Sequence, residues 1–167
     1  FNAFAKVSDE TLAAWAQILS AVPNSRLLLK SAAFSSEEGC AAAFERLQAA
    51  GIEPARVELR PDTREYLHEY HDVDIALDTF PYPGGGTTFD ALYMGVPVVT
   101  LRGDAHGTRF GFSILANLGL EDLAAADAAD YVAKAAALAE DTELLAALHK
   151  NLRPMMEKSP LMDGASY

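Results

Sequence analysis

The residues of this chain best suited to chemistry are three consecutive glycines followed by two threonines. The run Gly84-Gly85-Gly86-Thr87-Thr88 comes after an apolar, strand-like segment and opens a helix-like segment that contains Asp90. Glycine lets main-chain N–H groups approach an anion with no Cβ in the way. The first N–H groups of a helix lack internal partners and carry the positive end of its dipole. Phosphate is the natural ligand of that arrangement, and the threonine hydroxyls add donors.

Plainer interpretations of the same residues stay open. The glycine run is also compatible with a flexible loop that ends in a threonine N-cap, and Asp90 either caps the first helical turn or accepts hydrogen bonds from sugar hydroxyls. The run is neither a Walker loop nor the Gly-x-Gly-x-x-Gly of dinucleotide-binding turns. His68 and His71 have metal-compatible spacing, but no carboxylate and histidine set completes a site. We therefore expect no bound metal.

The elements that must position these residues alternate between helical and strand-like patterns. Residues 8–21 place Leu12, Trp15 and Leu19 at helical spacing, with acidic residues in the first turn. Short apolar runs of strand length follow, separated by further helical segments. The expected strands are residues 27–30, 57–59, 74–78 and 97–101, and the expected helices are residues 8–21, 35–50, 62–71, 87–94, 108–117, 128–139 and 142–152.

Two helix starts carry the spacing of a capping box, Ser35 with Glu38 and Asp62 with Glu65. The alanine-rich tract 124–139 is expected to be helical throughout. Strands that alternate with helices predict an α/β fold with a Rossmann-like parallel sheet and helices on both faces.

In such sheets the ligand lies beyond the carboxyl ends of the strands. Lys30 ends the first strand, so it either lines the cleft or neutralises neighbouring carboxylates. Tyr66 lies in the first turn of the segment after the second strand, which also places it at the ligand mouth. The alternative for Tyr66 is an ordinary core tyrosine packed with Leu67 and Tyr70.

Composition limits the remaining possibilities. The 167 residues are 50% hydrophobic and 22% charged, which suits a packed core, and we expect residues 1–167 to form one domain. The net charge of −11, with scattered basic residues, argues against binding to nucleic acids and to anionic membranes. No apolar run approaches the roughly 20 residues of a membrane span. A single cysteine, Cys40, rules out an internal disulfide framework and favours a cytoplasmic location.

Several strings together resemble one known family. They are Asp74-Ile75-Ala76-Leu77-Asp78, Pro81-Tyr82, the stretch from Gly85 through Asp90 to Leu101, and the opening Phe1-Asn2-Ala3-Phe4-Ala5-Lys6-Val7. Their order and spacing are similar to the sugar-nucleotide lobe of the O-linked N-acetylglucosamine transferases. The resemblance is strongest to bacterial members with tetratricopeptide repeats and to plant Spindly-type members, and it runs through nearly the whole chain.

The resemblance implies the C-terminal half of a two-lobed glycosyltransferase of the GT-B type. Such an enzyme moves N-acetylglucosamine from UDP-GlcNAc to Ser/Thr hydroxyls of proteins, with inversion and without a metal or other cofactor. Its repeats and N-terminal catalytic lobe, which bind the protein acceptor, would precede Phe1. We therefore expect this chain alone to bind nucleotide weakly and to transfer nothing. The alternatives are a related transferase with another nucleotide sugar or an Asn acceptor, and a non-catalytic docking module.

The resemblance also assigns roles to individual residues. Lys6 matches a lysine that contacts the diphosphate and supports the departing UDP, although a lone lysine is usually just solvated. Tyr66 falls where the family places a ring against uracil. The segment Gly84–Thr88 and Asp90 match the residues that hold the phosphates and the ribose. Several relatives have His in place of Gly85, which leaves more of the binding here to main-chain N–H groups.

Overall fold

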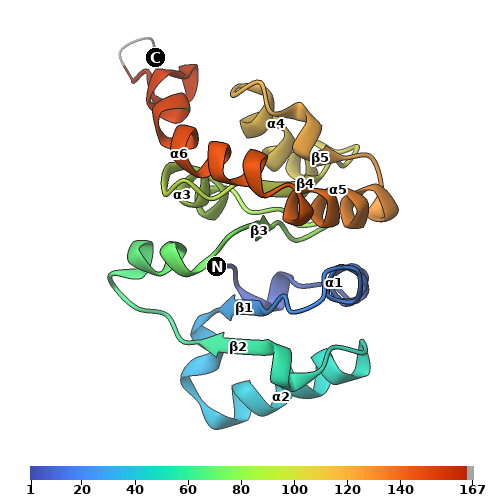
Figure 1. Cartoon of the computed structure of the whole chain (residues 1–167). Coiled ribbons are helices and arrows are strands. Elements are labelled where there is room, and N and C mark those ends of the chain that lie inside the picture. Colours follow the sequence, from blue (N-terminus) through green and yellow to red (C-terminus); the bar gives the residue numbers. More distant parts are fainter. Residues whose placement is uncertain (165–167) are drawn as a thin grey trace.

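Every strand pairing in the described part of the chain is parallel. A computed structural model describes residues 1–164, and in it β1 (Leu27–Lys30) pairs with β2 (Val57–Arg60), β3 (Ala76–Leu77) with β4 (Val98–Leu101), and β4 with β5 (Ala124–Ala125). The fold is therefore α/β with parallel strands, as predicted. Strands β1 and β3 do not pair with each other, so the described strands form a two-stranded and a three-stranded sheet (Figure 1).

Helices separate the strands along the chain, as the sequence pattern predicts. In Figure 1, α2 lies beside β1 and β2, whereas α3 to α6 surround β3, β4 and β5. The α-helices are α1 (Asp9–Ala21), α2 (Glu37–Ala49), α3 (Gly86–Tyr93), α4 (Phe110–Ala116), α5 (Ala128–Glu140) and α6 (Thr142–Lys158). Short 3-10 helices cover Phe4–Lys6, Ala32–Ser35, Pro54–Arg56, Tyr66–Asp72, His106–Thr108, Glu121–Leu123 and Pro160–Met162. No helix in the described part of the chain is long and apolar enough to cross a membrane.

Local sequence explains where α1 begins and which face it buries. The Ser8 hydroxyl accepts a hydrogen bond from the Thr11 N–H at 3.1 Å, which satisfies one of the free donors of the first turn. Leu12, Trp15 and Leu19 are buried, as their spacing predicts. The helix start and its apolar face are thus set by the same stretch of sequence.

The structure corrects three local predictions. The residue that caps α2 is Ser36, whose side chain accepts from the Gly39 N–H, and not Ser35. Asp62 and Glu65 form no capping box, because the helix there is a 3-10 helix that begins at Tyr66 without a side-chain cap. The tract 124–139 is also not entirely helical.

Strand β5 is the part of that tract that the sequence reading missed. Ala124 and Ala125 lie opposite Thr100 and Leu101 of β4, and Ala125 is fully buried. Alanine favours a helix by intrinsic propensity. Pairing with β4 and the burial of Ala125 override that propensity here.

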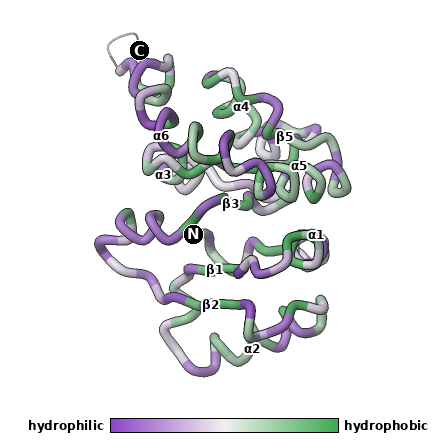
Figure 2. Tube along the Cα trace, in the orientation of Figure 1, coloured by the Kyte–Doolittle hydropathy of each residue, from purple (hydrophilic) through white to green (hydrophobic). Residues whose placement is uncertain are grey.

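The segment between β2 and β3 differs in character from the rest. It is mostly hydrophilic along its length (Figure 2), and residues 61–65 are all exposed. Ion pairs anchor it in addition to the buried Tyr70: Glu69 bonds Lys30 at 2.7 Å, and Asp72 bonds Arg60 at 2.7 Å.

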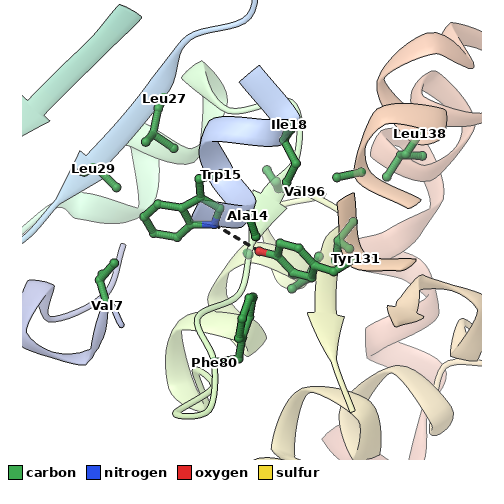
Figure 3. Packing of buried hydrophobic residues seen from close by; sticks show 14 of the residues in the cluster. Val7, Ala14, Trp15, Ile18, Leu27, Leu29, Phe80, Val96, Tyr131 and Leu138 are labelled. Carbon is green, nitrogen blue, oxygen red and sulfur yellow. Dashed lines mark hydrogen bonds between the residues drawn. The ribbon is translucent and has the colours of Figure 1, made fainter. Parts of the chain in front are cut away.

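One buried hydrogen-bond chain connects α1, α5 and the end of β3. The Tyr131 hydroxyl accepts from Trp15 Nε1 at 3.2 Å (Figure 3) and donates to the Asp78 carbonyl at 2.8 Å. The Phe80 ring packs edge-on against the Tyr131 ring. Tyr131 is fully buried, so none of these partners can turn to water instead. The position of the chain just after β3 therefore depends on the packing of two helices.

Replacing Tyr131 with Phe tests this connection. Tyr131→Phe leaves the Trp15 N–H and the Asp78 carbonyl buried without a partner, and we expect the free energy of unfolding to fall by about 1–3 kcal/mol. Tyr93→Phe is the matched control, because the Tyr93 hydroxyl bonds only the exposed Arg153. Chemical denaturation measures both. Equal, small losses in the two variants would contradict this account of Tyr131.

Candidate phosphate-binding site

The buried carboxylate of Asp78 organises the loop that leads into α3. Its Oδ1 accepts the Gly84 N–H at 2.6 Å and the Thr79 N–H at 3.1 Å, and its Oδ2 accepts the Thr100 hydroxyl at 2.8 Å. Burial raises the pKa of this carboxyl to about 6, although the hydrogen bonds and the charge of Lys6 act in the opposite direction. One side chain thus joins both ends of the loop to strand β4.

The loop is also fixed from the side of α1 and the N-terminal segment. The Thr11 hydroxyl donates to the Phe80 carbonyl at 2.7 Å and accepts the Phe80 N–H at 3.2 Å, and the Ser8 hydroxyl donates to the same carbonyl at 2.7 Å. The Asn2 side-chain amide donates to the Thr79 hydroxyl at 3.0 Å. A loop rich in glycine and proline is therefore held in one place, contrary to the flexible-loop alternative.

The three glycines have different surroundings. A Cβ on Gly84 would lie 2.5 Å from Thr87 Oγ1 and 2.8 Å from Thr88 Oγ1, so both threonine hydroxyls rest against this glycine. A Cβ on Gly85 or Gly86 would meet nothing within 4 Å. Gly84 is required by packing, whereas Gly85 and Gly86 face open space.

The start of α3 offers unused hydrogen-bond donors to that space. The helix begins at Gly86 with no side-chain cap, so the threonine N-cap considered from sequence is absent. The Gly85 carbonyl accepts the N–H groups of Thr88 and Phe89 at 3.1 Å. The N–H groups of Gly86 and Thr87 donate to nothing within residues 1–164. Such donors at a helix start bind anions.

Lys6 brings an unpaired positive charge to the same end of the sheets. It ends the 3-10 helix Phe4–Lys6, whose Phe4 N–H bonds the Ser31 hydroxyl just after β1. The Lys6 ammonium is exposed and forms no hydrogen bond or ion pair with any described residue. Its charge acts on Asp78, lowering the pKa of that carboxyl.

Tyr66 and Asp90 meet, although 24 positions separate them in sequence. The Tyr66 hydroxyl donates to Asp90 Oδ2 at 2.8 Å, and this hydrogen bond is the main cause of a raised Tyr66 pKa. Beside them, the Tyr70 hydroxyl donates to the Thr87 carbonyl at 3.2 Å. Tyr66 is only half-buried, so it is not the ordinary core residue of the alternative interpretation.

Lys30 lies at the predicted edge, but its donors are already used. Its ammonium donates to the Pro61 carbonyl at 2.6 Å, the Thr63 hydroxyl at 3.0 Å and Glu69 Oε1 at 2.7 Å. An ammonium has three N–H groups, so none remains for a ligand. Of the two roles left open, the structure favours neutralisation of a carboxylate, and Lys30 lowers the pKa of Glu69. Lys30, which we considered as a substrate-binding residue, therefore anchors the segment that carries Tyr66.

Sequence reasoning missed the residues that hold the loop, namely Asp78, Thr11 and Thr100. The available signal was an aspartate that ends a buried strand immediately before a Pro/Gly-rich loop. His68 and His71 are both exposed. Within residues 1–164, no group of three His, Cys, Asp or Glu side chains is placed to hold a metal ion.

Alanine at two neighbouring glycines tests the loop geometry. Gly84→Ala forces a Cβ against two hydroxyls, and we expect it to lower the free energy of unfolding by about 1–3 kcal/mol. Gly86→Ala is the matched control, since it enters open space and restricts the unfolded chain, with an expected change between zero and a gain of about 1 kcal/mol. Urea denaturation compares them. Similar losses at both positions would refute the packing around Gly84.

The buried carboxyl of Asp78 makes a prediction about pH. Its folded pKa of about 6 lies above the ordinary value of 3.8, so between these values the folded state keeps a proton that the unfolded chain releases. The contribution of Asp78 to stability is thus greatest at low pH and falls as pH rises through about 6. We expect the unfolding free energy of the wild type, minus that of Asp78→Asn, to drop by on the order of 2 kcal/mol from about pH 4 to about pH 7. Denaturation at a series of pH values measures this difference, and a difference independent of pH would contradict the burial of the carboxyl.

The chain is similar to known proteins over its whole length. A tomato (Solanum lycopersicum) protein named as a probable UDP-N-acetylglucosamine–peptide N-acetylglucosaminyltransferase SPINDLY is 44% identical over 170 residues. The UDP-N-acetylglucosamine–peptide N-acetylglucosaminyltransferase of Caenorhabditis elegans is 30% identical. This chain is covered completely in both alignments, yet it spans only 18% and 14% of the two relatives' lengths.

Structural comparison gives the same relationship. The fold matches a solved structure of a mutant Thermobaculum terrenum O-GlcNAc transferase with a TM-score of 0.91 and 34% identity, over 98% of this chain and 32% of that one. The family model of Glycosyl transferase family 41 matches residues 1–167. The chain therefore belongs to glycosyl transferase family 41.

Proposed function

We propose that this chain is the nucleotide-sugar-binding lobe of an enzyme that moves N-acetylglucosamine from UDP-GlcNAc to Ser/Thr hydroxyls of proteins. The observation that carries the proposal has two parts. The Lys6 ammonium has no partner among the described residues and its charge acts on Asp78, and the N–H groups of Gly86 and Thr87 have no acceptor there. Lys6 differs from other exposed basic residues because its charge acts on Asp78, whose carboxylate binds the loop that leads into α3, so a cation and main-chain donors are available to one anionic ligand. The relatives named as transferases act on a nucleotide diphosphate sugar, whose phosphates supply that charge.

The arrangement suits the departure of UDP. In the transfer, the bond between the anomeric carbon and the β-phosphate oxygen breaks, and its electron pair stays on that oxygen. The acceptor hydroxyl oxygen forms the new bond on the opposite face of the sugar and loses its proton. Negative charge grows on the β-phosphate, where Lys6 and the first N–H groups of α3 stabilise it. Asp78 holds the loop that precedes those donors, so the donors need not change orientation during the reaction.

The nucleoside would occupy the neighbouring side of the site. Tyr66 offers an aromatic face to uracil, and such stacking contributes about 1–3 kcal/mol per base. Asp90 has one oxygen bonded to Tyr66 and a second available for ribose hydroxyls. Lys30 acts indirectly, because its bonds to Pro61 and Thr63 hold the chain that leads to Tyr66.

Other parts of the reaction fall outside this chain. The groups that bind the protein acceptor and activate its hydroxyl belong to the remainder of the longer protein in this proposal, and the leaving group is stabilised without a metal. The donor is a UDP-sugar in a cytoplasmic enzyme. Donor profiling of the full-length protein distinguishes GlcNAc from other sugars.

Calorimetry with UDP on the full-length protein tests the assignment of Lys6. Lys6→Ala removes a charge-assisted contact, and we expect binding to weaken by about 1.5–3 kcal/mol. Thr87→Ala removes a neutral hydroxyl donor and should cost about 1 kcal/mol.

The matched control is Lys158→Ala, since Lys158 is an exposed lysine at the end of α6. It should leave UDP affinity unchanged. If Lys6→Ala and Lys158→Ala bind UDP equally well, Lys6 does not contact the diphosphate. If the unaltered protein ignores UDP, the chain is a docking module and the enzyme assignment fails.

A further inference from the structure

The two free donors at the start of α3 adjoin glycines that no side-chain packing holds. The N–H groups of Gly86 and Thr87 have no acceptor among residues 1–164. A Cβ on Gly85 or Gly86 would meet nothing within 4 Å, so neighbouring atoms do not confine these two residues. Glycine also restricts the backbone less than any other residue. The direction of the free N–H groups therefore depends on contacts before and after the glycines.

One hydrogen bond fixes the chain before these glycines, and a second fixes it after them. Before them, Asp78 Oδ1 accepts the Gly84 N–H at 2.6 Å. After them, the Tyr70 hydroxyl donates to the Thr87 carbonyl at 3.2 Å. The N–H of the same peptide group donates to the Gly85 carbonyl at 3.1 Å, so this group is held at both ends. The peptide group directly before it carries the free Thr87 N–H, whose direction therefore depends on the Tyr70 hydroxyl.

Tyr70 can hold α3 because its own position is fixed. Its side chain is buried, with only 2% exposed. Its ring stacks on the Phe1 ring, with the centroids 4.0 Å apart and an angle of 16° between the planes. Glu69 and Asp72, on either side of it in the 3-10 helix, form ion pairs with basic residues of β1 and β2. The hydroxyl therefore reaches the Thr87 carbonyl from a well-supported position.

The 3-10 helix that carries Tyr70 contacts α3 at a second point, and the two contacts differ in kind. The Tyr66 hydroxyl bonds the Asp90 side chain, and Tyr66 is half-buried. Thr87 and Asp90 are three positions apart, so both contacts lie on one face of α3. Tyr70 is buried and bonds the main chain instead. It therefore acts on a ligand through Thr87 and not by direct contact.

We propose that Tyr70 is a positioning residue for the diphosphate, because its hydroxyl holds the first turn of α3 with the Gly86 and Thr87 N–H groups directed at one anion. This inference rests on the proposed function, which takes that anion to be the diphosphate of a nucleotide sugar. Asp78 fixes the loop before the glycines and Tyr70 fixes it after them, so the donors are oriented before the ligand binds. Donors oriented in advance stabilise the charge that grows on the β-phosphate at no cost of rearrangement.

Tyr70→Phe in the full-length protein tests this role. The variant keeps the ring against Phe1 and removes only the hydroxyl. A neutral hydrogen bond has a modest net value, so we expect UDP to bind about three- to tenfold more weakly. Uridine lacks the phosphates, and its affinity should stay unchanged. Isothermal titration calorimetry measures both affinities, and a role of Tyr70 in stability alone would not lower their ratio.

Tyr93→Phe is the matched control, because the Tyr93 hydroxyl bonds Arg153 at the opposite end of α3. It should leave both affinities unchanged. Hydrogen exchange of the ligand-free proteins gives a second readout. The amides of Thr88 and Phe89, in the first turn of α3, should exchange faster in Tyr70→Phe than in the wild type. In Tyr93→Phe they should exchange at the wild-type rate.

Two results from the folded variant would overturn the proposal. If Tyr70→Phe weakens UDP and uridine equally, Tyr70 only supports the segment that carries Tyr66. If it binds UDP as the wild type does, the hydroxyl does not position the donors, and the proposed function still stands. If the wild type binds UDP no more tightly than uridine, the proposed function fails together with this inference.

A second replacement guards against a folding defect in Tyr70→Phe. 4-Fluorophenylalanine at position 70 fills the space of the hydroxyl but donates no hydrogen bond, so it should lower the ratio of UDP to uridine affinity in the same way. Chemical denaturation shows whether each protein is folded. If neither replacement folds, the hydroxyl is required for the fold as a whole, and a local positioning role is wrong.

Discussion

The buried carboxylate of Asp78 is the constraint on which the candidate site depends. It receives two loop N–H groups and the Thr100 hydroxyl, while its own main-chain carbonyl receives the Tyr131 hydroxyl. A carboxyl group in this position is costly to bury alone, and the surrounding donors offset that cost. Through this one residue, the packing of α1 against α5 is connected to the loop that leads into α3. Substitutions that alter the packing of α1 against α5 should therefore change ligand binding at the candidate site, although the substituted residues do not contact the ligand.

The second feature of the site is the separation of its parts in sequence. Lys6 comes from the N-terminal segment, the loop and Asp90 follow β3, and Tyr66 belongs to a hydrophilic segment held by the Lys30–Glu69 ion pair. Hydrogen bonds or ion pairs of its own fix each of these parts at the carboxyl ends of the strands. The basic groups that neutralise carboxylates, such as Lys30, are distinct from Lys6, which stays exposed.

Much of this arrangement could be predicted from sequence, because local patterns carry it. The glycine run before Thr87 and the periodic apolar face of α1 each depend on a few consecutive residues. Strand β5 could not be predicted, since two alanines become a strand only through pairing with β4. Sequence could not decide between the two roles considered for Lys30, because its partner Glu69 is 39 positions away. The break between β1 and β3 involves main-chain groups, which side-chain identity does not report.

Amide chemical shifts during titration test the central claim most directly, namely that a nucleotide diphosphate rests on the start of α3. Isotope-labelled protein would be titrated with UDP and, separately, with uridine, which lacks the phosphates. The account predicts that the amides of Gly86 and Thr87 shift with UDP and stay unchanged with uridine. Equal responses to both ligands, or UDP-dependent shifts confined to other parts of the chain, would contradict it.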